Sequence, residues 1–308
     1  MRTPLAYQNG MFLPANQVSI PLTDAGFVLG VTISEQLRTF RGSLFRPAQH
    51  WRRLARSLEI AGMTSPLPLE EIDRAAEELA KYNYALLENG DDLGLAVAIT
   101  PGTLPSFARA GQTGPTVNIH TFPLAFDRWS NAYRDGVRLR TTPYRQVSPA
   151  NWPAELKCRS RMHYHLADQS AATAEQGARA LLLDEFGQVN ETSSANVLVV
   201  RGPRVISPPR ARILRGISWE VTAELVTAAG WVFEDRPIEL EELQAAEEVL
   251  LTSTPFGILP AVSCNGQAIG TGQPGPVFGE LLGAWSELTG VDLASQAARM
   301  SKPENWQS

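Results

Sequence analysis

Glu191-Thr192-Ser193-Ser194-Ala195-Asn196, read together with Leu156-Lys157-Cys158 earlier in the chain, is the stretch that decides how this sequence is interpreted. Only three of the 27 basic residues are lysines, and the other two, Lys81 and Lys302, lie in segments where a solvated amine is the ordinary explanation. A chain that uses arginine almost everywhere keeps an amine at position 157. This preference indicates chemistry that a guanidinium cannot perform.

An unprotonated lysine amine can form a Schiff base with an aldehyde, whereas the guanidinium of arginine stays protonated. Pyridoxal phosphate needs such a lysine, and it also needs a group that controls the charge on its pyridine nitrogen. Lys157 and Glu191 can supply both functions. The pair therefore predicts a pyridoxal phosphate site in which Lys157 is the catalytic residue.

The composition is that of a soluble enzyme large enough for two domains. A chain of 308 residues can bury a sizeable core. The net charge of -5 argues against a nucleic-acid surface, and no window approaches the ~18 apolar residues of a membrane span. The N-terminal residues lack the apolar stretch of a signal peptide, so we expect a cytoplasmic protein.

Metal and disulfide chemistry are not indicated. Cys158 and Cys264 cannot form a disulfide framework, and they lack the spacing of metal ligands. The four histidines include no zinc signature. We therefore expect two free thiols and no metal site.

Periodicity predicts a small first domain over residues 1–126. Asn9-Gly10 is a strong hairpin signal. The strands and helices expected after it cover 32–40, 49–61, 69–88, 93–100 and 115–123. The pattern loosens over 127–135, which we expect to be an interdomain linker.

A larger domain is expected over 136–291, followed by a polar C-terminal tail over 292–308. Its expected strands cover 137–142, 178–183, 195–200 and 204–206. Its expected helices cover 162–176, 218–229 and 276–288. Strands and helices alternate too irregularly for a doubly wound parallel sheet, so the fold class is α+β, with a small α/β N-terminal domain and mixed β structure flanked by helices in the larger one.

Residues 270–275, Gly-Thr-Gly-Gln-Pro-Gly, match the dinucleotide pattern G-x-G-x-x-G. That fingerprint must open a βαβ unit, and only one helix and a polar tail are expected after it. Pro274 also removes an amide that could face a pyrophosphate. A cofactor-binding or nucleotide-binding module without enzymatic activity remains a third interpretation, based on this segment.

The order and spacing of the motifs resemble the class IV, or fold-type IV, pyridoxal phosphate enzymes. These are the branched-chain aminotransferases, the D-amino-acid aminotransferases and aminodeoxychorismate lyase. The resemblance covers nearly the whole chain. It is carried by Asn9-Gly10, Glu35-Gln36-Leu37-Arg38, His50-x-x-Arg53-Leu54, Lys157, Glu191–Asn196, Leu214–Ser218, Thr252-Ser253-Thr254 and Gly270–Pro276.

The resemblance implies a role for each residue of a cofactor site. Lys157 forms the bond to the cofactor and moves a proton from the substrate α-carbon. Glu191 pairs with the pyridine nitrogen and keeps it protonated. The phosphate group is bound by Arg53, by the amides of Ile217 and Ser218 at a helix start, and by Thr254.

The chain departs from the family pattern around the substrate. Met162 stands where branched-chain enzymes have a tyrosine, and Pro255 has no amide to offer the substrate carboxylate. Pro101 stands where D-amino-acid enzymes carry a carboxylate-binding arginine. The candidate substrate-binding residues are Arg38, Arg145, Arg159, Arg161 and, in a loop that could exclude water, Trp152.

The leading hypothesis is an aminotransferase that moves an amino group from a branched-chain-like or D-amino acid to a 2-oxo acid. The alternative is aminodeoxychorismate lyase, which eliminates pyruvate and yields 4-aminobenzoate with the same lysine. Lys157-x-x-Ser160-Arg161-Met162 favours the lyase, whereas Glu35 favours the aminotransferase. The resemblance further implies a homodimer, and neither a nucleic acid nor a membrane is expected as a partner.

Overall fold

The computed structural model describes residues 3–108 and 114–301 of the chain. The chain divides into two compact units. Unit 1 consists of Met1–Leu124 and Leu156–Ser160, and unit 2 consists of Ala125–Glu155 and Arg161–Ser308. The segment that contains Lys157 therefore belongs to unit 1, although the residues on both sides of it belong to unit 2.

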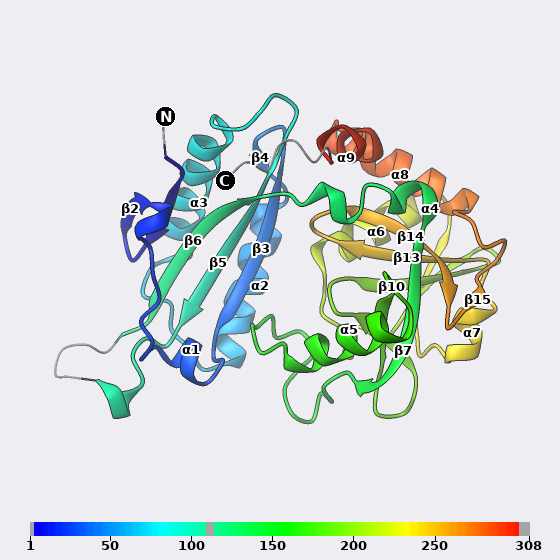
Figure 1. Ribbon diagram of the computed structural model, residues 1–308, viewed down its shortest axis with the longest axis horizontal. Coiled ribbons are helices and arrows are strands. Elements are labelled where there is room, and N and C mark those ends of the chain that lie inside the picture. Colours follow the sequence, from blue (N-terminus) through cyan, green and yellow to red (C-terminus); the bar gives the residue numbers. More distant parts are fainter. Residues whose placement is uncertain (1–2, 109–113, 302–308) are drawn as a thin grey trace. The chain divides into compact units, whose positions relative to one another are not determined.

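Within the described residues, unit 1 holds an antiparallel sheet of six strands in the order β2-β1-β6-β5-β3-β4. The strands are β1 (Leu5–Gln8), β2 (Met11–Pro14), β3 (Ile33–Phe40), β4 (Ser43–Leu44), β5 (Leu93–Thr100) and β6 (Thr116–Pro123). The helices are α1 (Ala25–Val28), α2 (Pro47–Ile60) and α3 (Leu69–Tyr84), with short 3-10 turns η1 (Ala15–Gln17) and η2 (Pro105–Phe107). Helices α2 and α3 pack against each other and against the sheet (Figure 1).

The core of unit 1 follows from the spacing of its apolar residues. Trp51, Leu54 and Leu58 recur every three to four residues along α2, so they lie on one buried face. That face packs on buried strand residues such as Leu37 and Leu95. Each leucine buried in this way contributes about 1.5–3 kcal/mol to stability. The packing holds α2 beside β3, the two elements that carry the charged residues described below.

Unit 2 contains a nine-stranded mixed sheet within its described residues, in the order β12-β11-β10-β13-β14-β7-β8-β9 with β15 beside β14. The strands are β7 (Val137–Arg145), β8 (Arg179–Leu183), β9 (Val189–Thr192), β10 (Asn196–Arg201), β11 (Arg204–Ser207), β12 (Val232–Asp235), β13 (Glu248–Ser253), β14 (Gly257–Cys264) and β15 (Gln267–Ala268). Strand β9 also pairs with β10 through Glu191 and Asn196, so the strands from β10 to β9 close on themselves. The stretch Glu191–Asn196 makes this closure.

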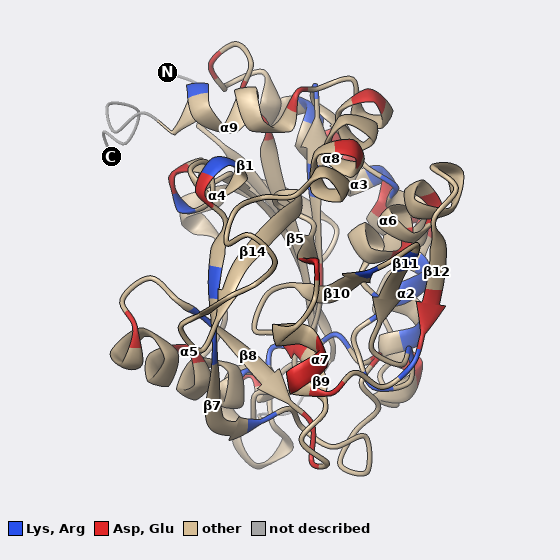
Figure 2. Ribbon diagram, turned by 90° about the vertical axis from the view of Figure 1, so that its right-hand side faces the viewer, with Lys and Arg blue, Asp and Glu red and all other residues tan. Residues whose placement is uncertain are grey.

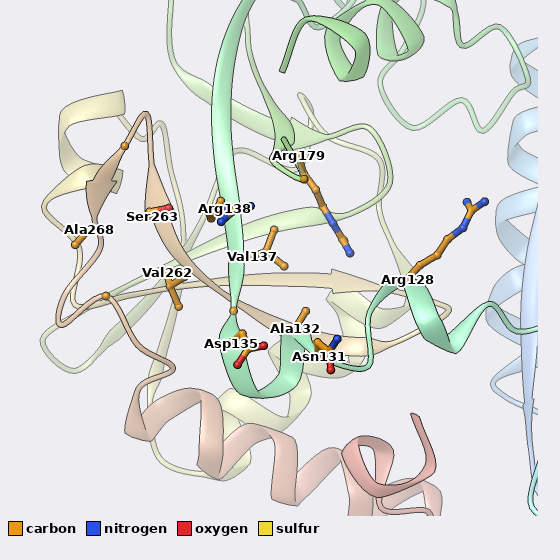
Figure 3. Close-up of a pocket in the computed structure, with 14 residues that line it drawn as sticks. Arg128, Asn131, Ala132, Asp135, Val137, Arg138, Arg179, Val262, Ser263 and Ala268 are labelled. Carbon is orange, nitrogen blue, oxygen red and sulfur yellow. The ribbon is translucent and has the colours of Figure 1, made fainter. Parts of the chain in front are cut away.

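The helices of unit 2 lie on both sides of the closed strands. They are η3 (Phe126–Arg128), α4 (Ala132–Asp135), α5 (Met162–Ala174), α6 (Ile217–Ala228), α7 (Leu240–Gln244), α8 (Pro276–Thr289) and α9 (Leu293–Met300). Helix α5 packs on β7 and β8, while α6 and α8 pack on β13 and β14. Acidic residues mark β12 and α7 (Figure 2). A pocket of about 710 Å³ opens beside β7 (Figure 3).

Two segments of unit 2 differ from the sequence-based expectation. Residues 127–135, expected as a linker, are part of the folded unit: Trp129 is buried, and the Tyr133 hydroxyl donates to the carbonyl oxygen of Phe256 at 2.6 Å. The expected polar tail begins with helix α9, which buries Leu293 and Ala297. The two segments contact each other through η3 and α9, so their burial depends on long-range packing that the sequence alone does not reveal.

No helix in residues 3–108 or 114–301 combines the length and the apolar character needed to cross a membrane. Over the same two ranges, no group of three or more His, Cys, Asp or Glu side chains is placed to hold a metal ion.

Candidate functional site

Glu191 is the centre of a buried hydrogen-bond network in unit 2. Its side chain is 5% exposed. One carboxylate oxygen accepts hydrogen bonds from the Tyr164 hydroxyl at 2.6 Å and from Nε2 of Gln146 at 2.5 Å. The other accepts from Nδ2 of Asn196 and from the backbone N–H of Leu214, both at 3.2 Å. Four uncharged donors therefore hold the carboxylate in one position and favour its ionised form.

Tyr164 and Gln146 support Glu191 through a second set of contacts. Burial and the charge of Glu191 raise the pKa of the Tyr164 phenol well above its usual value of 10, so the phenol remains a donor. Nε2 of Gln146 also donates to the Tyr164 oxygen at 2.7 Å, and Oε1 of Gln146 lies 2.9 Å from Nε2 of His163. Burial, assisted by the charge of Arg161, lowers the pKa of His163. The imidazole is therefore neutral at pH 7.

The start of α6 is attached to the same network. Nδ2 of Asn196 donates to the carbonyl oxygen of Leu214 at 2.8 Å. A Cβ on Gly216 would lie 2.3 Å from Oδ1 of Asn196, so only glycine fits before the helix. Among the described residues, the backbone N–H groups of Ile217 and Ser218 have no hydrogen-bond acceptor. A helix start with such amides attracts an anion.

Thr254 lies in the turn between β13 and β14. The hydroxyl of Ser253 donates to the carbonyl oxygen of Ser194 at 2.6 Å, which connects this turn to the Glu191–Asn196 stretch. Strand β13 also pairs with β10, beginning with Thr252 opposite Asn196. Unit 2 thus links three of the expected cofactor-binding elements by direct hydrogen bonds: the Glu191 stretch, the segment before α6 and the Thr254 turn.

The helix start that follows the glycine-rich segment, at α8, is bound by a carboxylate of the protein itself. The backbone N–H groups of Val277 and Phe278 donate to the two carboxylate oxygens of Glu248 at 2.8 and 2.9 Å. A Cβ on Gly275 would lie 2.2 Å from the Glu248 carboxyl carbon. The Glu248 carboxylate therefore accepts the hydrogen bonds that this helix start could otherwise donate to a phosphate. The dinucleotide interpretation of residues 270–275 is therefore not supported.

In unit 1, the backbone of Lys157 is fixed between β3 and α2. The N–H of Ser34 donates to its carbonyl oxygen at 3.0 Å, and its own N–H donates to the Ser57 hydroxyl at 3.2 Å. Cys158 forms an antiparallel bridge with Ile33. The lysine segment therefore adds to the edge of β3, which gives its backbone a defined position.

Glu35, His50 and Arg53 form a buried charged cluster next to this segment. Nε and Nη2 of Arg53 donate to the two oxygens of Glu35 at 2.9 and 2.6 Å, and Nδ1 of His50 lies 2.9 Å from one of them. Burial alone would raise the pKa of Glu35, but the charge of Arg53 and the hydrogen bonds of Arg53 and His50 hold it far below its usual range. Two of the three guanidinium nitrogens of Arg53 are thus bonded to Glu35, a pairing that the sequence did not indicate.

The charge of Lys157 affects the pKa of His50 in the same cluster. Burial lowers the pKa of His50; Glu35 opposes this shift, and the charges of Arg53 and Lys157 add to it. His50 is therefore a neutral partner of Glu35 at pH 7, and Arg53 carries the positive charge that balances the carboxylate.

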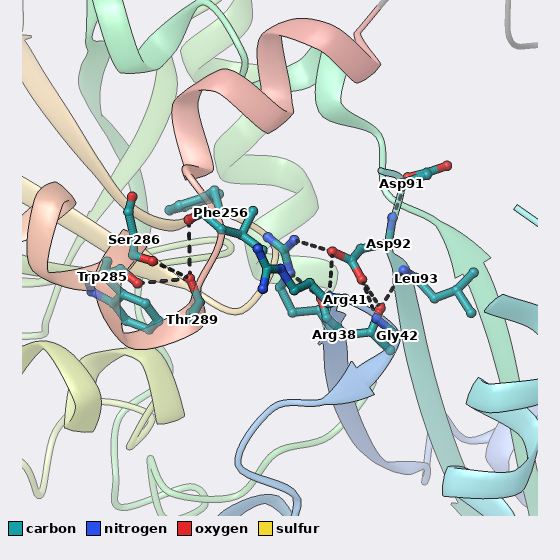
Figure 4. A network of polar contacts seen from close by, with 12 residues as sticks. Arg38, Arg41, Gly42, Asp91, Asp92, Leu93, Phe256, Trp285, Ser286 and Thr289 are labelled. Carbon is teal, nitrogen blue, oxygen red and sulfur yellow. Dashed lines mark hydrogen bonds and ion pairs between the residues drawn. The ribbon is translucent and has the colours of Figure 1, made fainter. Parts of the chain in front are cut away.

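The buried side chain of Arg38 contacts neighbouring residues at the end of β3. Its Nε donates to the carbonyl oxygen of Thr39 at 3.1 Å, and its guanidinium lies 4.0 Å from the centre of the Phe40 ring. Nη2 lies 3.9 Å from Asp92, which also accepts from the Thr39 hydroxyl at 2.6 Å (Figure 4). Arg38 is 2% exposed. Its expected role in binding the substrate carboxylate remains a prediction.

The remaining substrate candidates are placed differently. Arg161 donates to the carbonyl oxygen of Ser193, and its guanidinium lies 4.5 Å from the centre of the Tyr164 ring, so it adjoins the Glu191 network. Arg145 is exposed at the end of β7, and Trp152 is half-buried in the loop after it. Arg159 is exposed in unit 1.

The chain is similar in sequence to proteins named as aminotransferases. The chain is 28% identical to branched-chain-amino-acid aminotransferase-like protein 2 of Arabidopsis thaliana over 92% of its own length, but it spans only 50% of that relative. It is also 28% identical to the D-alanine aminotransferase of Bacillus licheniformis, covering 87% of this chain and 91% of the relative.

The fold is that of solved branched-chain aminotransferases. The enzyme of Thermoproteus uzoniensis has a TM-score of 0.83 at 22% identity, with 94% of this chain and 95% of that chain covered. The enzyme of Thermobaculum terrenum has a TM-score of 0.82 at 22% identity, with 97% and 96% covered. This likeness confirms the expected α+β, fold-type IV architecture. Because the family described as amino-transferase class IV matches residues 32–264, more than half of the sequence, the chain belongs to the class IV aminotransferases, whose cofactor is pyridoxal phosphate.

Proposed function

We propose that this protein is a pyridoxal phosphate-dependent aminotransferase that moves an amino group from an amino acid to a 2-oxo acid. The observation that carries the proposal is the buried Glu191 carboxylate, held by four uncharged donors in the same unit as the helix-start amides of Ile217 and Ser218. Such a donor set fits a ligand that has a basic ring nitrogen and a phosphate.

Each expected cofactor-binding residue keeps its role in this proposal. Glu191 binds the protonated pyridine nitrogen. The amides of Ile217 and Ser218, together with Thr254, bind the phosphate. Arg53 adds a positive charge for the phosphate while it remains paired with Glu35. When bound, the cofactor supplies an aldehyde for the Lys157 amine and a ring that accepts electrons.

The residues of this chain perform the proton transfers. Lys157, whose backbone is fixed by β3 and α2, would be the base that accepts and returns the α-proton of the substrate, a role that requires its amine to be neutral. Glu191 keeps a proton on the ring nitrogen, because its ionised form is stabilised by Tyr164 and Gln146. Arg161, which adjoins this network, is the candidate that best fits the substrate carboxylate.

The donor is proposed to be a branched-chain-like or a D-amino acid, with a 2-oxo acid as acceptor. The relatives named branched-chain and D-alanine aminotransferase support both donor classes. The relatives and solved structures reported above are named as aminotransferases, which favours transamination over the lyase reaction. Met162, which stands in place of the tyrosine of branched-chain enzymes, is 69% exposed.

A homodimer and a cytoplasmic location belong to the same proposal. Leu22, Phe27 and Leu29 of unit 1 are 77%, 67% and 60% exposed, and clustered apolar exposure of this kind supports association with a second copy. Cys158 and Cys264 are free thiols, as expected in a reducing compartment.

A half-reaction experiment tests the proposed reaction. Protein saturated with pyridoxal phosphate is mixed separately with L-amino acids, D-amino acids and aminodeoxychorismate, and the cofactor absorbance is recorded. A transamination donor should convert the cofactor to a stable pyridoxamine phosphate form, which a 2-oxo acid then reverses. If aminodeoxychorismate gives 4-aminobenzoate and pyruvate while no amino acid changes the spectrum, the lyase replaces the aminotransferase.

A further inference from the structure

The pocket of about 710 Å³ in unit 2 is separate from every residue expected to bind cofactor or substrate. It lies where η3 and α4 meet β7, β8 and the β14–β15 hairpin (Figure 3). Four glycines, Gly136, Gly177, Gly266 and Gly272, contribute backbone rather than side chains to its wall. The pocket is therefore wide enough for a small organic molecule, and its specificity must come from the few polar side chains that line it.

Arg179 is the polar side chain that distinguishes this pocket. It is the first residue of β8, and Figure 3 shows its side chain pointing into the space between β7 and the segment that carries Arg128. Burial lowers the pKa of Arg179, while the charge of Asp168 acts in the opposite direction. Within the described residues, no acceptor makes a hydrogen bond or an ion pair with this guanidinium, which contacts the Phe256 ring at 5.5 Å instead.

A second arginine on the same wall, Arg138, has a guanidinium with hydrogen-bond and ion-pair partners. Arg138 donates from Nη2 to the carbonyl oxygen of Gln176 at 2.7 Å, and its Nε lies 3.1 Å from Glu175. Arg179 has no such partners in the described structure. Arg179 is half-buried, and its side chain points into the pocket, so its guanidinium can bind a ligand that brings its own acceptors.

The charged residues that line the pocket indicate which class of ligand it can bind. Arg128, Arg138 and Arg179 line the pocket, and the one acidic side chain among its lining residues is Asp135. Asp135 is bonded in a bidentate manner to Arg134, at 2.7 and 2.8 Å. Glu175 pairs with Arg138 and Asp168 partly offsets Arg179, so the remaining positive charge of the wall comes from Arg128 and Arg179. This charge favours an anion, and a planar guanidinium fits a carboxylate or a phosphate through two parallel hydrogen bonds.

We propose that this pocket is a binding site for a small organic or inorganic oxyanion, a carboxylate or a phosphate, held by Arg179 with help from Arg128. The site is distinct from the cofactor phosphate site, whose proposed donors are on α6 and in the Thr254 turn.

Binding at this pocket is linked to the Thr254 turn, and this step alone rests on the proposed function. The Phe256 ring that Arg179 contacts is 3% exposed and lies 6.3 Å from the Trp129 ring. Phe256 belongs to the same turn as Thr254. An anion that draws Arg179 away from Phe256 changes the packing behind this turn, so anion binding and cofactor binding should alter each other's affinity by the same factor.

Calorimetric titration tests the site directly. Protein saturated with pyridoxal phosphate is titrated with sodium phosphate and, separately, with succinate, at constant ionic strength and with chloride as the reference anion. We expect saturable binding of at least one of the two oxyanions, and the one that binds identifies the ligand class. Arg179→Gln should weaken that binding roughly ten- to a hundredfold.

Matched variants control for general charge effects. Arg204→Gln removes the same charge from β11, where Arg204 forms an exposed pair with Glu234 outside the lining of the pocket, so its affinity should equal that of the wild type. Arg179→Lys keeps the charge but loses the bidentate geometry, so it should also bind the anion more weakly than the wild type. This variant provides the test if Arg179→Gln fails to fold. Because the readout is binding, it is independent of whether the protein transaminates.

Two results would overturn the proposal. One is the absence of saturable binding of both phosphate and succinate to the wild type. The other is wild-type affinity in folded Arg179→Gln or Arg179→Lys, which would place the bound anion elsewhere on the protein.

Discussion

Replacing Arg53 with alanine is expected to destabilise the protein before it affects any chemistry. Glu35 is fully buried, and Arg53 supplies two hydrogen bonds and the positive charge opposite it. Removing one partner of a buried ion pair leaves an uncompensated charge and costs about 3–5 kcal/mol. His50 cannot replace the guanidinium at pH 7, because burial lowers its pKa and leaves the ring neutral.

The sign of the pH dependence follows from the pKa of Glu35. In the folded wild type this pKa lies far below the ~4.3 of an unfolded glutamate, so Glu35 contributes stability above pH ~4.3 that is lost as the pH falls below it. In Arg53→Ala the folded pKa moves upward, because burial now acts without the arginine. The difference in stability between wild type and variant should therefore be largest near pH 7 and should shrink toward pH 4.

Urea unfolding at pH 7 and pH 4, followed by far-ultraviolet circular dichroism, measures this difference without added cofactor. Arg56→Ala is the matched control, since Arg56 lies on the same helix and forms an exposed pair with Glu59 at 2.8 Å, which contributes at most about 1 kcal/mol. Glu35→Gln combined with Arg53→Ala should recover part of the loss. If Arg53→Ala costs no more than Arg56→Ala, or costs the same at both pH values, the role assigned to the Glu35 cluster is wrong.

Three further changes test other parts of the structure. Lys157→Ala should abolish the borohydride-reducible bond to pyridoxal phosphate, and peptide mapping that finds the adduct on another lysine would refute the assignment. Glu191→Gln should slow α-proton removal more than a hundredfold, about 3 kcal/mol, whereas Tyr164→Phe, which removes one of the four donors, should cost roughly tenfold in single-turnover kinetics. Gly275→Ala should lower the urea midpoint, because its Cβ would displace the Glu248 carboxylate; Gly279→Ala, with open space around its Cβ, should not.

The regular elements of unit 1 could be predicted because their signals are local. The expected strand over 93–100 is β5, and the expected helix over 49–61 contains most of α2. The Asn9-Gly10 hairpin is confirmed as well: both residues have positive φ, 48° and 93°, and β1 pairs with β2 across them. A turn and a helix stripe are set by neighbours within four residues, so the sequence reveals them.

The partners of Glu191 could not be predicted in this way. Tyr164 and Gln146 come from α5 and from the end of β7, and the pairing of β8 with both β7 and β9 brings them to the same carboxylate. Strand β9 is itself a short element without alternating apolar residues. The Glu35–Arg53 pair was missed for the same reason, since it depends on how α2 lies across β3. Contacts between segments that are far apart in sequence do not produce a periodic residue pattern in either segment.

The two helix starts of unit 2 show why a motif alone does not define an anion site. Gly216 and Gly275 both precede a helix, and at both positions a Cβ would collide with a polar side chain from a neighbouring strand. Before α8 that side chain is the Glu248 carboxylate, which accepts the first amides and neutralises the helix start. Before α6 it is the Asn196 amide, which bonds Leu214 and Glu191 and leaves the N–H groups of Ile217 and Ser218 without an acceptor in the part of the chain that the structure describes. The charge of the one residue opposite the glycine therefore decides which helix start can take a phosphate, and this choice favours α6 over the more conspicuous glycine-rich segment.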